Sequence, residues 1–132
     1  YPDYQVAKIR TWPLVTAAFY IADSNNNTIR AVTSDWQVTT LAGEAGVAGS
    51  DDGVGVTAHF RNPYGLACSP AGDIYVPDLN HLIRKVSPQG VVTTVAGDNV
   101  EGEPEPGYID GFTDGTGAEA RFFNPFWICV AR

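Results

Sequence analysis

The sequence predicts an all-β fold of the β-propeller type, with about two blades and the first strand of a third present in this chain. Residues 19–43 are nearly repeated at 72–97, and both segments end in Val-Thr-Thr-x-Ala-Gly, with Gly43 and Gly97 standing 54 positions apart. Short runs rich in Val, Ile, Thr and Tyr alternate with turn formers, and no segment has helical apolar spacing. Repeated blades around an axis leave only short, protected sheet edges, which makes the propeller the expected architecture.

The strand signals are clearest in the second copy. Its apolar runs are GLAC at 65–68, DIYVP at 73–77, HLIRKV at 81–86 and VVTTVA at 91–96. Two of the connections share the pattern Ser-Pro-x-Gly, in which proline pre-sets the second turn position and glycine tolerates the fourth. We therefore expect a blade of four antiparallel strands, with its first strand near 64–68 and the equivalent strand of the first copy near 13–18.

The loops between blades also repeat. Asp52-Gly53-Val54-Gly55 matches Asp114-Gly115-Thr116-Gly117, and Phe60 matches Phe122, 62 positions later. Each phenylalanine follows an alanine by two positions, so strand-like alternation places both side chains on one face. We expect both aromatic rings to be largely buried, as a plug between neighbouring blades.

The chain divides along this repeat into four parts. These are a remnant of a preceding blade at 1–12, a blade with its loop at 13–62, a blade with a longer loop at 63–124, and the first strand of a further blade at 125–132. Two blades alone would leave apolar flanks uncovered, so the expected partners are further blades, from the same chain or from identical copies.

Within the second copy, Asn80-His81-Leu82 spells the tripeptide NHL and is followed by Ile83 and Arg84. The chain resembles the NHL-repeat β-propeller family. It is similar to the subgroup whose blades end in VTT-x-AG and are joined by D-G-x-G-x-x-A-x-F-x-x-P-x-G loops, and the resemblance covers about residues 13–132. It implies a ring of roughly six blades, of which this chain supplies part.

Two tryptophans depart from the repeat. Trp36 stands where the sister copy has Gly90, and Trp127 stands where it has Gly65. Tryptophan at a turn glycine meets a positive φ, and its large ring needs a packing partner. We favour local divergence or an uncertain sequence as the interpretation, and the alternative is an aromatic contact surface.

The charge argues against nucleic acid as a partner. The net charge is −7, with only 8 Lys and Arg residues. Some NHL propellers bind RNA through a basic face, and affinity for phosphates depends on clustered cations that this chain lacks. No run of eighteen apolar residues and no signal peptide is visible in the sequence, so no membrane span is expected.

Cys68 and Cys129 are not expected to pair. Alignment of the copies places Cys129 on Ala67, one residue out of phase, and neighbouring strand residues point to opposite faces. We expect two free, buried thiols. Asn26 begins an Asn-x-Thr glycosylation pattern in a hairpin loop, which matters if the protein is extracellular or on the cell surface, the expected location.

The glycine-rich loops are the best candidates for a metal site. Their carboxylates are Asp51, Asp52, Asp110 and Asp114. Calcium takes six to eight oxygen ligands, but the spacing does not match an EF-hand, and Asp-Gly is a common tight turn. We expect a structural inter-blade loop and keep calcium as the alternative cofactor.

No catalytic constellation is visible. The only two histidines, His59 and His81, occupy ordinary positions of the repeat. The expected function is therefore a non-catalytic scaffold or protein-interaction module in a larger assembly, inferred by family analogy. The alternatives are part of a metal-dependent propeller lactonase or lyase whose site is completed by further blades, and an RNA-binding propeller, which the acidity disfavours.

Overall fold

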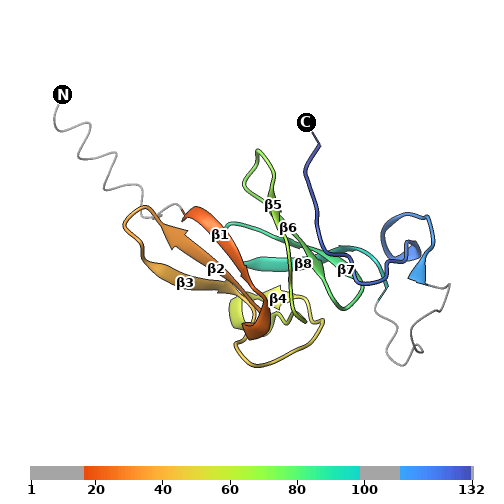
Figure 1. The fold of residues 1–132 in the computed structure, drawn as a ribbon, viewed down its shortest axis with the longest axis horizontal. Coiled ribbons are helices and arrows are strands. Elements are labelled where there is room, and N and C mark those ends of the chain that lie inside the picture. The colour runs from red at the N-terminus through yellow and green to blue at the C-terminus, as the bar shows by residue number, and fades with distance from the viewer. Residues whose placement is uncertain (1–16, 99–110, 132) are drawn as a thin grey trace.

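In the computed structural model, residues 17–98 and 111–131 are described, and they form two antiparallel sheets that lie side by side (Figure 1). The three-stranded sheet contains β1 (Ala17–Asp23), β2 (Thr28–Thr33) and β3 (Val38–Ala42) in that order. The five-stranded sheet has the order β4-β8-β7-β6-β5, with β4 (Gly53–Val54), β5 (Ala67–Cys68), β6 (Ile74–Asp78), β7 (Leu82–Val86) and β8 (Val91–Ala96). Single turns of 3-10 helix include η1 (Ser24–Asn26), η2 (Gly55–Thr57) and η4 (Gly117–Glu119). The prediction of an all-β, partial propeller-like fold is confirmed.

The two sheets repeat one ladder in detail. In the first, Arg30 pairs with Thr40 after a register shift between Ile29 and Arg30. In the second sheet, Arg84 pairs with Thr94 after a register shift at the equivalent place, between Ile83 and Arg84. The predicted outer strands at 19–43 and 72–97 are therefore confirmed as equivalent units.

The innermost strands are shorter than expected. The strand predicted near 64–68 is reduced to β5, and 13–18 falls mostly outside the described residues. Residues 125–131 carry no strand assignment, so their role as the first strand of a further blade stays a prediction. The same holds for the blade remnant assigned to 1–12, which also lies outside the described residues.

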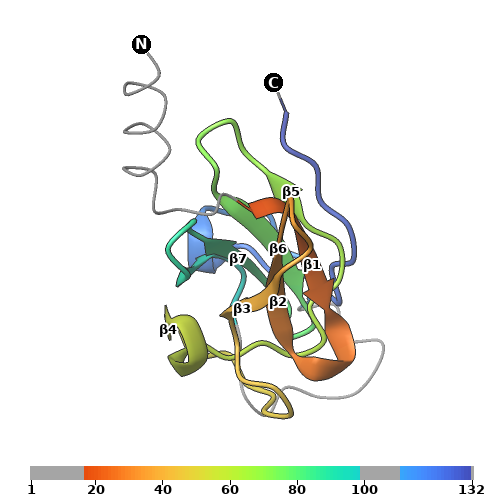
Figure 2. The same cartoon turned by 90° about the vertical axis from the view of Figure 1, so that its left-hand side faces the viewer.

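Strand β4 corrects the expectation of four strands in a blade. This piece of the loop after the first blade crosses to the second blade and pairs with its outer strand, Gly53 opposite Val92 and Val54 opposite Val91. Figure 2 shows β4 next to its 3-10 turn η2 and near β3, to which η2 is joined by the hydrogen bond from the Gly43 N–H to the Gly55 carbonyl. The pairing covers an edge that would otherwise expose unpaired backbone groups.

One apolar core spans both sheets. Its buried members include Ile29 and Ala42 from the first blade, and Ile74, Val76, Val86 and Val92 from the second. Phe60 and Ala58, both 0% exposed, lie within it, as predicted. Phe122 is only half-buried, because the described chain has a blade after Phe60 but none after Phe122.

Left-handed backbone recurs at equivalent positions. Trp36 and Gly90 both have positive φ, 69° and 82°, in the hairpin turns before β3 and β8. The strain expected for Trp36 is therefore present, and its ring meets Phe19 edge-on at 5.9 Å between centroids. Trp127 is 80% exposed and lies against the Cα of Gly65, the residue whose place it takes in the repeat.

The two cysteines are free, as expected, but they are exposed instead of buried. Cys68 is at the end of the two-residue β5, and Cys129 lies in a segment without strand partners. Both therefore lie at the open margin of the sheets. Within residues 17–98 and 111–131, no helix is long and apolar enough to cross a membrane.

Candidate functional site

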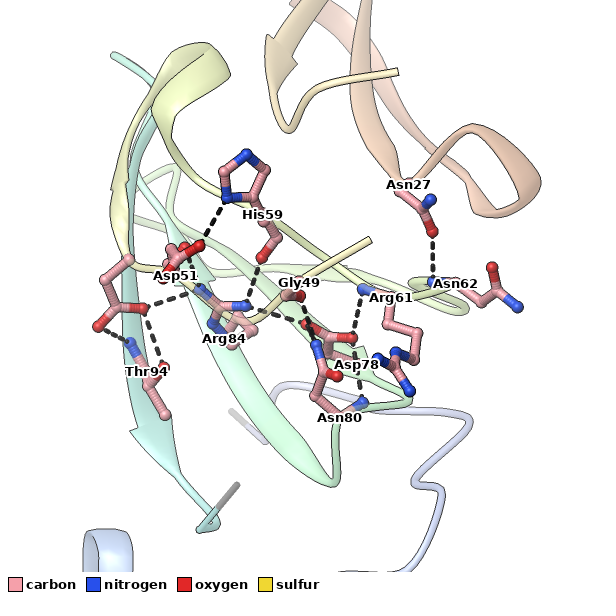
Figure 3. Close-up of polar contacts among 11 residues, drawn as sticks. Asn27, Gly49, Asp51, His59, Arg61, Asn62, Asp78, Asn80, Arg84 and Thr94 are labelled. Atoms are coloured by element: carbon pink, nitrogen blue, oxygen red, sulfur yellow. Dashed lines mark hydrogen bonds and ion pairs between the residues drawn. The ribbon is translucent and has the colours of Figure 1, made fainter. Parts of the chain in front are cut away.

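The densest polar cluster surrounds the Arg84 side chain, which is 0% exposed (Figure 3). Its Nη1 donates to the carbonyl of His59 and to Oδ2 of Asp78, both at 2.9 Å. Its Nη2 donates to the carbonyl of Asp51 at 2.9 Å and to Oδ1 of Asp52 at 2.8 Å. The guanidinium carbon also lies 5.1 Å from the centroid of the Phe60 ring, a cation–π contact.

The partners of Arg84 come from two different blades. Asp78 ends β6 in the same blade as the arginine, whereas Asp51, Asp52 and His59 belong to the loop that follows the first blade. Arg84 is thus a joint between blades. A guanidinium is suited to this position because it remains charged and holds several acceptors in a fixed plane.

Asp52 uses both carboxylate oxygens in this joint. Oδ1 accepts from Arg84 and from the Thr94 hydroxyl at 2.9 Å, and Oδ2 accepts from the Thr94 N–H at 3.0 Å. Burial acts to raise the pKa of Asp52, but the hydrogen bonds from Thr94 and Arg84 outweigh it and lower that pKa below its ordinary value. The carboxylate is therefore held in its charged form.

Asp78 is fully buried and organises the turn after β6. Its Oδ1 accepts the N–H groups of Arg61 at 2.9 Å and Asn80 at 3.2 Å. The Asn80 amide donates to Oδ2 of Asp78 at 3.3 Å and to the carbonyl of Gly49 in the preceding loop. Burial raises the pKa of Asp78, and the N–H of Arg61 and the charge of Arg84 partly offset this.

The histidine of the tripeptide connects forward to the next loop. His81 has a φ of 67°, and its Nδ1 accepts the N–H of Asn124 at 3.1 Å. Its ring stacks on Phe123 at 5.4 Å. Asn27, the equivalent residue of the first blade, has a φ of 58° and accepts the N–H of Asn62 at 2.9 Å.

The other two residues of the motif predicted at Asn80 to Arg84 pack in the sheet. Leu82 is 3% exposed, and Ile83 is half-buried beside Arg84. All five motif residues, Asn80 to Arg84, thus have a structural contact in the described chain.

His59 is held by two acidic groups. Its Nδ1 lies 2.7 Å from Asp51, and its Nε2 lies 3.4 Å from Glu44. The hydrogen bond to Asp51 raises the pKa of His59, burial lowers it, and the bond to Glu44 adds to the increase. In the second loop the equivalent pair is Arg121 with Asp98, at 3.7 Å, so a basic side chain beside an acidic one recurs at this position.

The three predicted calcium ligands that the structure describes, Asp51, Asp52 and Asp114, do not form one group. Asp52 binds Arg84 and Thr94, Asp51 binds His59, Asp114 is exposed in the second loop, and Asp110 lies outside the described residues. Among the residues described, no group of three or more His, Cys, Asp or Glu side chains is arranged to hold a metal ion. Asn26 is exposed, and its Nδ2 donates to Asp23 at 3.0 Å.

Sequence reasoning missed the pairing of Asp52 with Arg84 and the part played by Thr94. A signal existed, because Asp52 recurs as Asp114 and Arg84 recurs as Arg30. Their contact was not evident, because this carboxylate of the loop bonds to the blade after the loop, whereas other residues of the loop bond to the blade before it.

A second feature is an aromatic surface beside the inner strands. Tyr64 and Phe126 lie 4.3 Å apart between ring centroids, and Trp127 covers Gly65. A shallow hollow of about 390 Å³ opens there, lined by Ala22, Ser24, Tyr64, Gly65, Leu66 and Trp127. The surface contains exposed aromatic side chains and one serine whose hydroxyl donates to the carbonyl of Pro63.

The known proteins that are similar to this chain are longer than it is. No family model matches the sequence. Protein SUPPRESSOR OF QUENCHING 1, chloroplastic, from Arabidopsis thaliana is 34% identical over 128 residues, which cover 86% of this chain and 11% of that protein. The chain therefore spans about a tenth of the length of this curated relative.

Solved structures from Bacteroides share the fold. A protein of unknown function from Bacteroides thetaiotaomicron is 30% identical with a TM-score of 0.69, over 85% of this chain and 27% of that one. An auxiliary nutrient binding protein from the same species is 30% identical with a TM-score of 0.68, over 83% of this chain and 29% of that one. One from Bacteroides ovatus, at 24% identity and a TM-score of 0.65, shows the likeness of fold alone, and covers 82% of this chain and 28% of its own.

Proposed function

We propose that the chain is a segment of an NHL-type β-propeller that acts as a non-catalytic scaffold and protein-binding module within a larger assembly. The observation that carries this proposal is the joint at Arg84. Three hydrogen bonds from one buried guanidinium tie the loop of the first blade to the second blade, and a fourth holds Asp78 within the second blade. The polar residues of the repeat thus build a propeller frame.

The same bonds occupy the acidic and basic side chains of this cluster that could otherwise act as catalytic groups. Asp52, Asp78 and His59 would attract attention as acids or bases, yet each has a structural partner: Asp52 bonds to Arg84, Asp78 to the Arg61 N–H, and His59 to Asp51 of its own loop. A general acid or base must reach a substrate proton, and none of these three groups is free of structural bonds to do so. This favours a framework function over catalysis for this part of the propeller.

Two further observations support a binding module. One is the name of a solved structure similar to this chain, an auxiliary nutrient binding protein. The other is the aromatic surface at Tyr64, Phe126 and Trp127, since exposed aromatic side chains are typical of binding surfaces. We propose the extracellular space or the cell surface as the location, where Asn26, exposed in η1, would be available for glycosylation.

The enzyme alternative is a metal-dependent lactonase or lyase completed by further blades, and metal content separates it from a scaffold. We would purify the chain, and the longest native protein that contains it, without chelators. We expect less than stoichiometric divalent metal by elemental mass spectrometry and an unchanged melting temperature with EDTA. One tightly bound metal per propeller, or a clear loss of stability with EDTA, would contradict the scaffold.

A further inference from the structure

The second loop repeats the backbone of the first, but among the described residues no arginine lies against it as Arg84 lies against the first loop. The N–H of Arg121 donates to the carbonyl of Thr113 at 2.9 Å, as the N–H of His59 does to Asp51 at 3.0 Å. The N–H of Gly97 donates to the carbonyl of Gly117, as Gly43 does to Gly55, both at 3.1 Å. The loop at 111–123 is therefore already in the conformation that holds an arginine in the first loop.

The groups that would contact that arginine are open. Asp114 is exposed and Phe122 half-buried, whereas their counterparts Asp52 and Phe60 contact Arg84. A hollow of about 900 Å³ opens here, lined by Gly111, Thr113, Asp114, Arg121, Phe122 and Phe123 among others. We call this hollow the Asp114 socket.

We propose that the Asp114 socket binds the arginine of another blade of this repeat, one that carries a glycine in the hairpin turn before its outer strand. In this complex the guanidinium donates to the Asp114 carboxylate and to the carbonyls of Thr113 and Arg121, and it lies over the Phe122 ring. The inference rests on the proposed function and deepens it, because it names the kind of partner and the contact that selects it.

The first blade of a second copy has the matching charges. Arg30 lies 3.2 Å from Asp23, with side chains 31% and 29% exposed, and it pairs across the ladder with Thr40 as Arg84 does with Thr94. In the described chain, no loop covers Arg30 in the way that the first loop covers Arg84. Charge complementarity alone would therefore allow copies to join head to tail.

The hairpin turn excludes that partner. Gly90 is buried between the blades, and a Cβ placed there would lie 2.6 Å from the carbonyl oxygen of Leu41 in the preceding blade. The first blade has Trp36 in this turn, with the same positive φ. A blade with a tryptophan here cannot approach the preceding outer strand as the second blade does. The requirement for glycine follows, and an unmodified second copy is excluded.

The test is to remove the obstacle in the full chain. We expect the unmodified chain to be monomeric and the Trp36→Gly chain to associate head to tail, measured by sedimentation velocity over a concentration series. Trp36→Ala is the matched control, since it also removes the indole and its contact with Phe19 but keeps the Cβ, and it should stay monomeric. Circular dichroism would verify that each variant keeps its strands.

Second substitutions locate the contact. In the Trp36→Gly background, Asp114→Asn and Arg30→Met should each weaken association by about 30-fold or more, the range for breaking a close charge pair at an interface. Asp73→Asn, which changes an acid near Lys85 on the surface of the second blade, should have no effect. A mixture of the Asp114 and Arg30 variants should form one-to-one dimers and no longer chains, because each retains one half of the contact.

Four outcomes would overturn the proposal. The first is a Trp36→Gly chain that keeps its strands and stays monomeric, and the second is an unmodified chain that associates until Asp114→Asn abolishes the association. The third is a Trp36→Ala chain that associates as strongly as Trp36→Gly. The fourth is association of the Trp36→Gly chain that Asp114→Asn leaves unchanged. None of them bears on metal content or on the effect of EDTA, so the scaffold proposal and this proposal fail separately.

Discussion

Arg84 and Asp52 are 32 positions apart in the chain, and their side chains meet at 2.8 Å between Nη2 and Oδ1. One lies in the middle strand of the second blade, and the other belongs to the loop leaving the first. The pair joins the loop that leaves the first blade to the second blade.

Removal of the arginine should be costly. Arg84→Met leaves Asp78 buried without its counter-ion, so we expect the free energy of unfolding to fall by about 3–5 kcal/mol in urea denaturation. The exposed Arg61, changed to Met, is the matched control and should alter stability by less than about 0.5 kcal/mol. A loss below about 1 kcal/mol for Arg84→Met would mean that the joint is not a main source of stability.

The two loop phenylalanines should differ in their contribution. Phe60→Ala removes a ring that is 0% exposed in the core and should cost about 3–5 kcal/mol. Phe122→Ala removes a ring that is only half-buried here and should cost clearly less in the same assay. Equal losses would show that the Asp114 socket is already filled in solution.

His59 should make stability depend on pH. Its pKa is higher in the folded chain than the ordinary value of 6.5, chiefly because Asp51 accepts its hydrogen bond. The stabilisation is therefore fully present below about pH 6.5 and is lost as the pH rises through the folded-state pKa. His59→Gln should lower the free energy of unfolding more at about pH 5.5 than at about pH 8.5. The same loss at both values would rule out this charge interaction.

Any side chain at position 65, beneath the Trp127 ring, should destabilise the fold. A Cβ at Gly65 would overlap the indole ring, so Gly65→Ala should displace residues 125–131 and change the tryptophan emission. The double variant with Trp127→Ala should recover stability relative to Gly65→Ala, measured by thermal unfolding. Failure of the second substitution to restore any stability would indicate that another contact demands the glycine.

Much of the fold follows from local signals. The outer strands at 19–43 and 72–97 are predicted by three signals, and the structure confirms them. These signals are apolar residues at every second position, runs rich in Val and Thr, and the repeated ending Val-Thr-Thr-x-Ala-Gly. The turn glycines and the left-handed backbone at Trp36 are also local, since φ depends on sterics within a few residues. Burial of Phe60 was predictable because alternation along the loop places it with Ala58.

The sequence by itself therefore determined the blade: its strand order, its turns and the face on which its apolar residues lie. Only the tertiary structure decided which blade each loop completes, and with it the pairing of β4 with β8 and of Asp52 with Arg84. It also decided the difference between Phe60 and Phe122, which have the same local pattern but unequal burial. Strand propensity acts within a few neighbouring residues, whereas burial and charge pairing depend on segments brought together from distant parts of the chain, and here on whether a following blade is present.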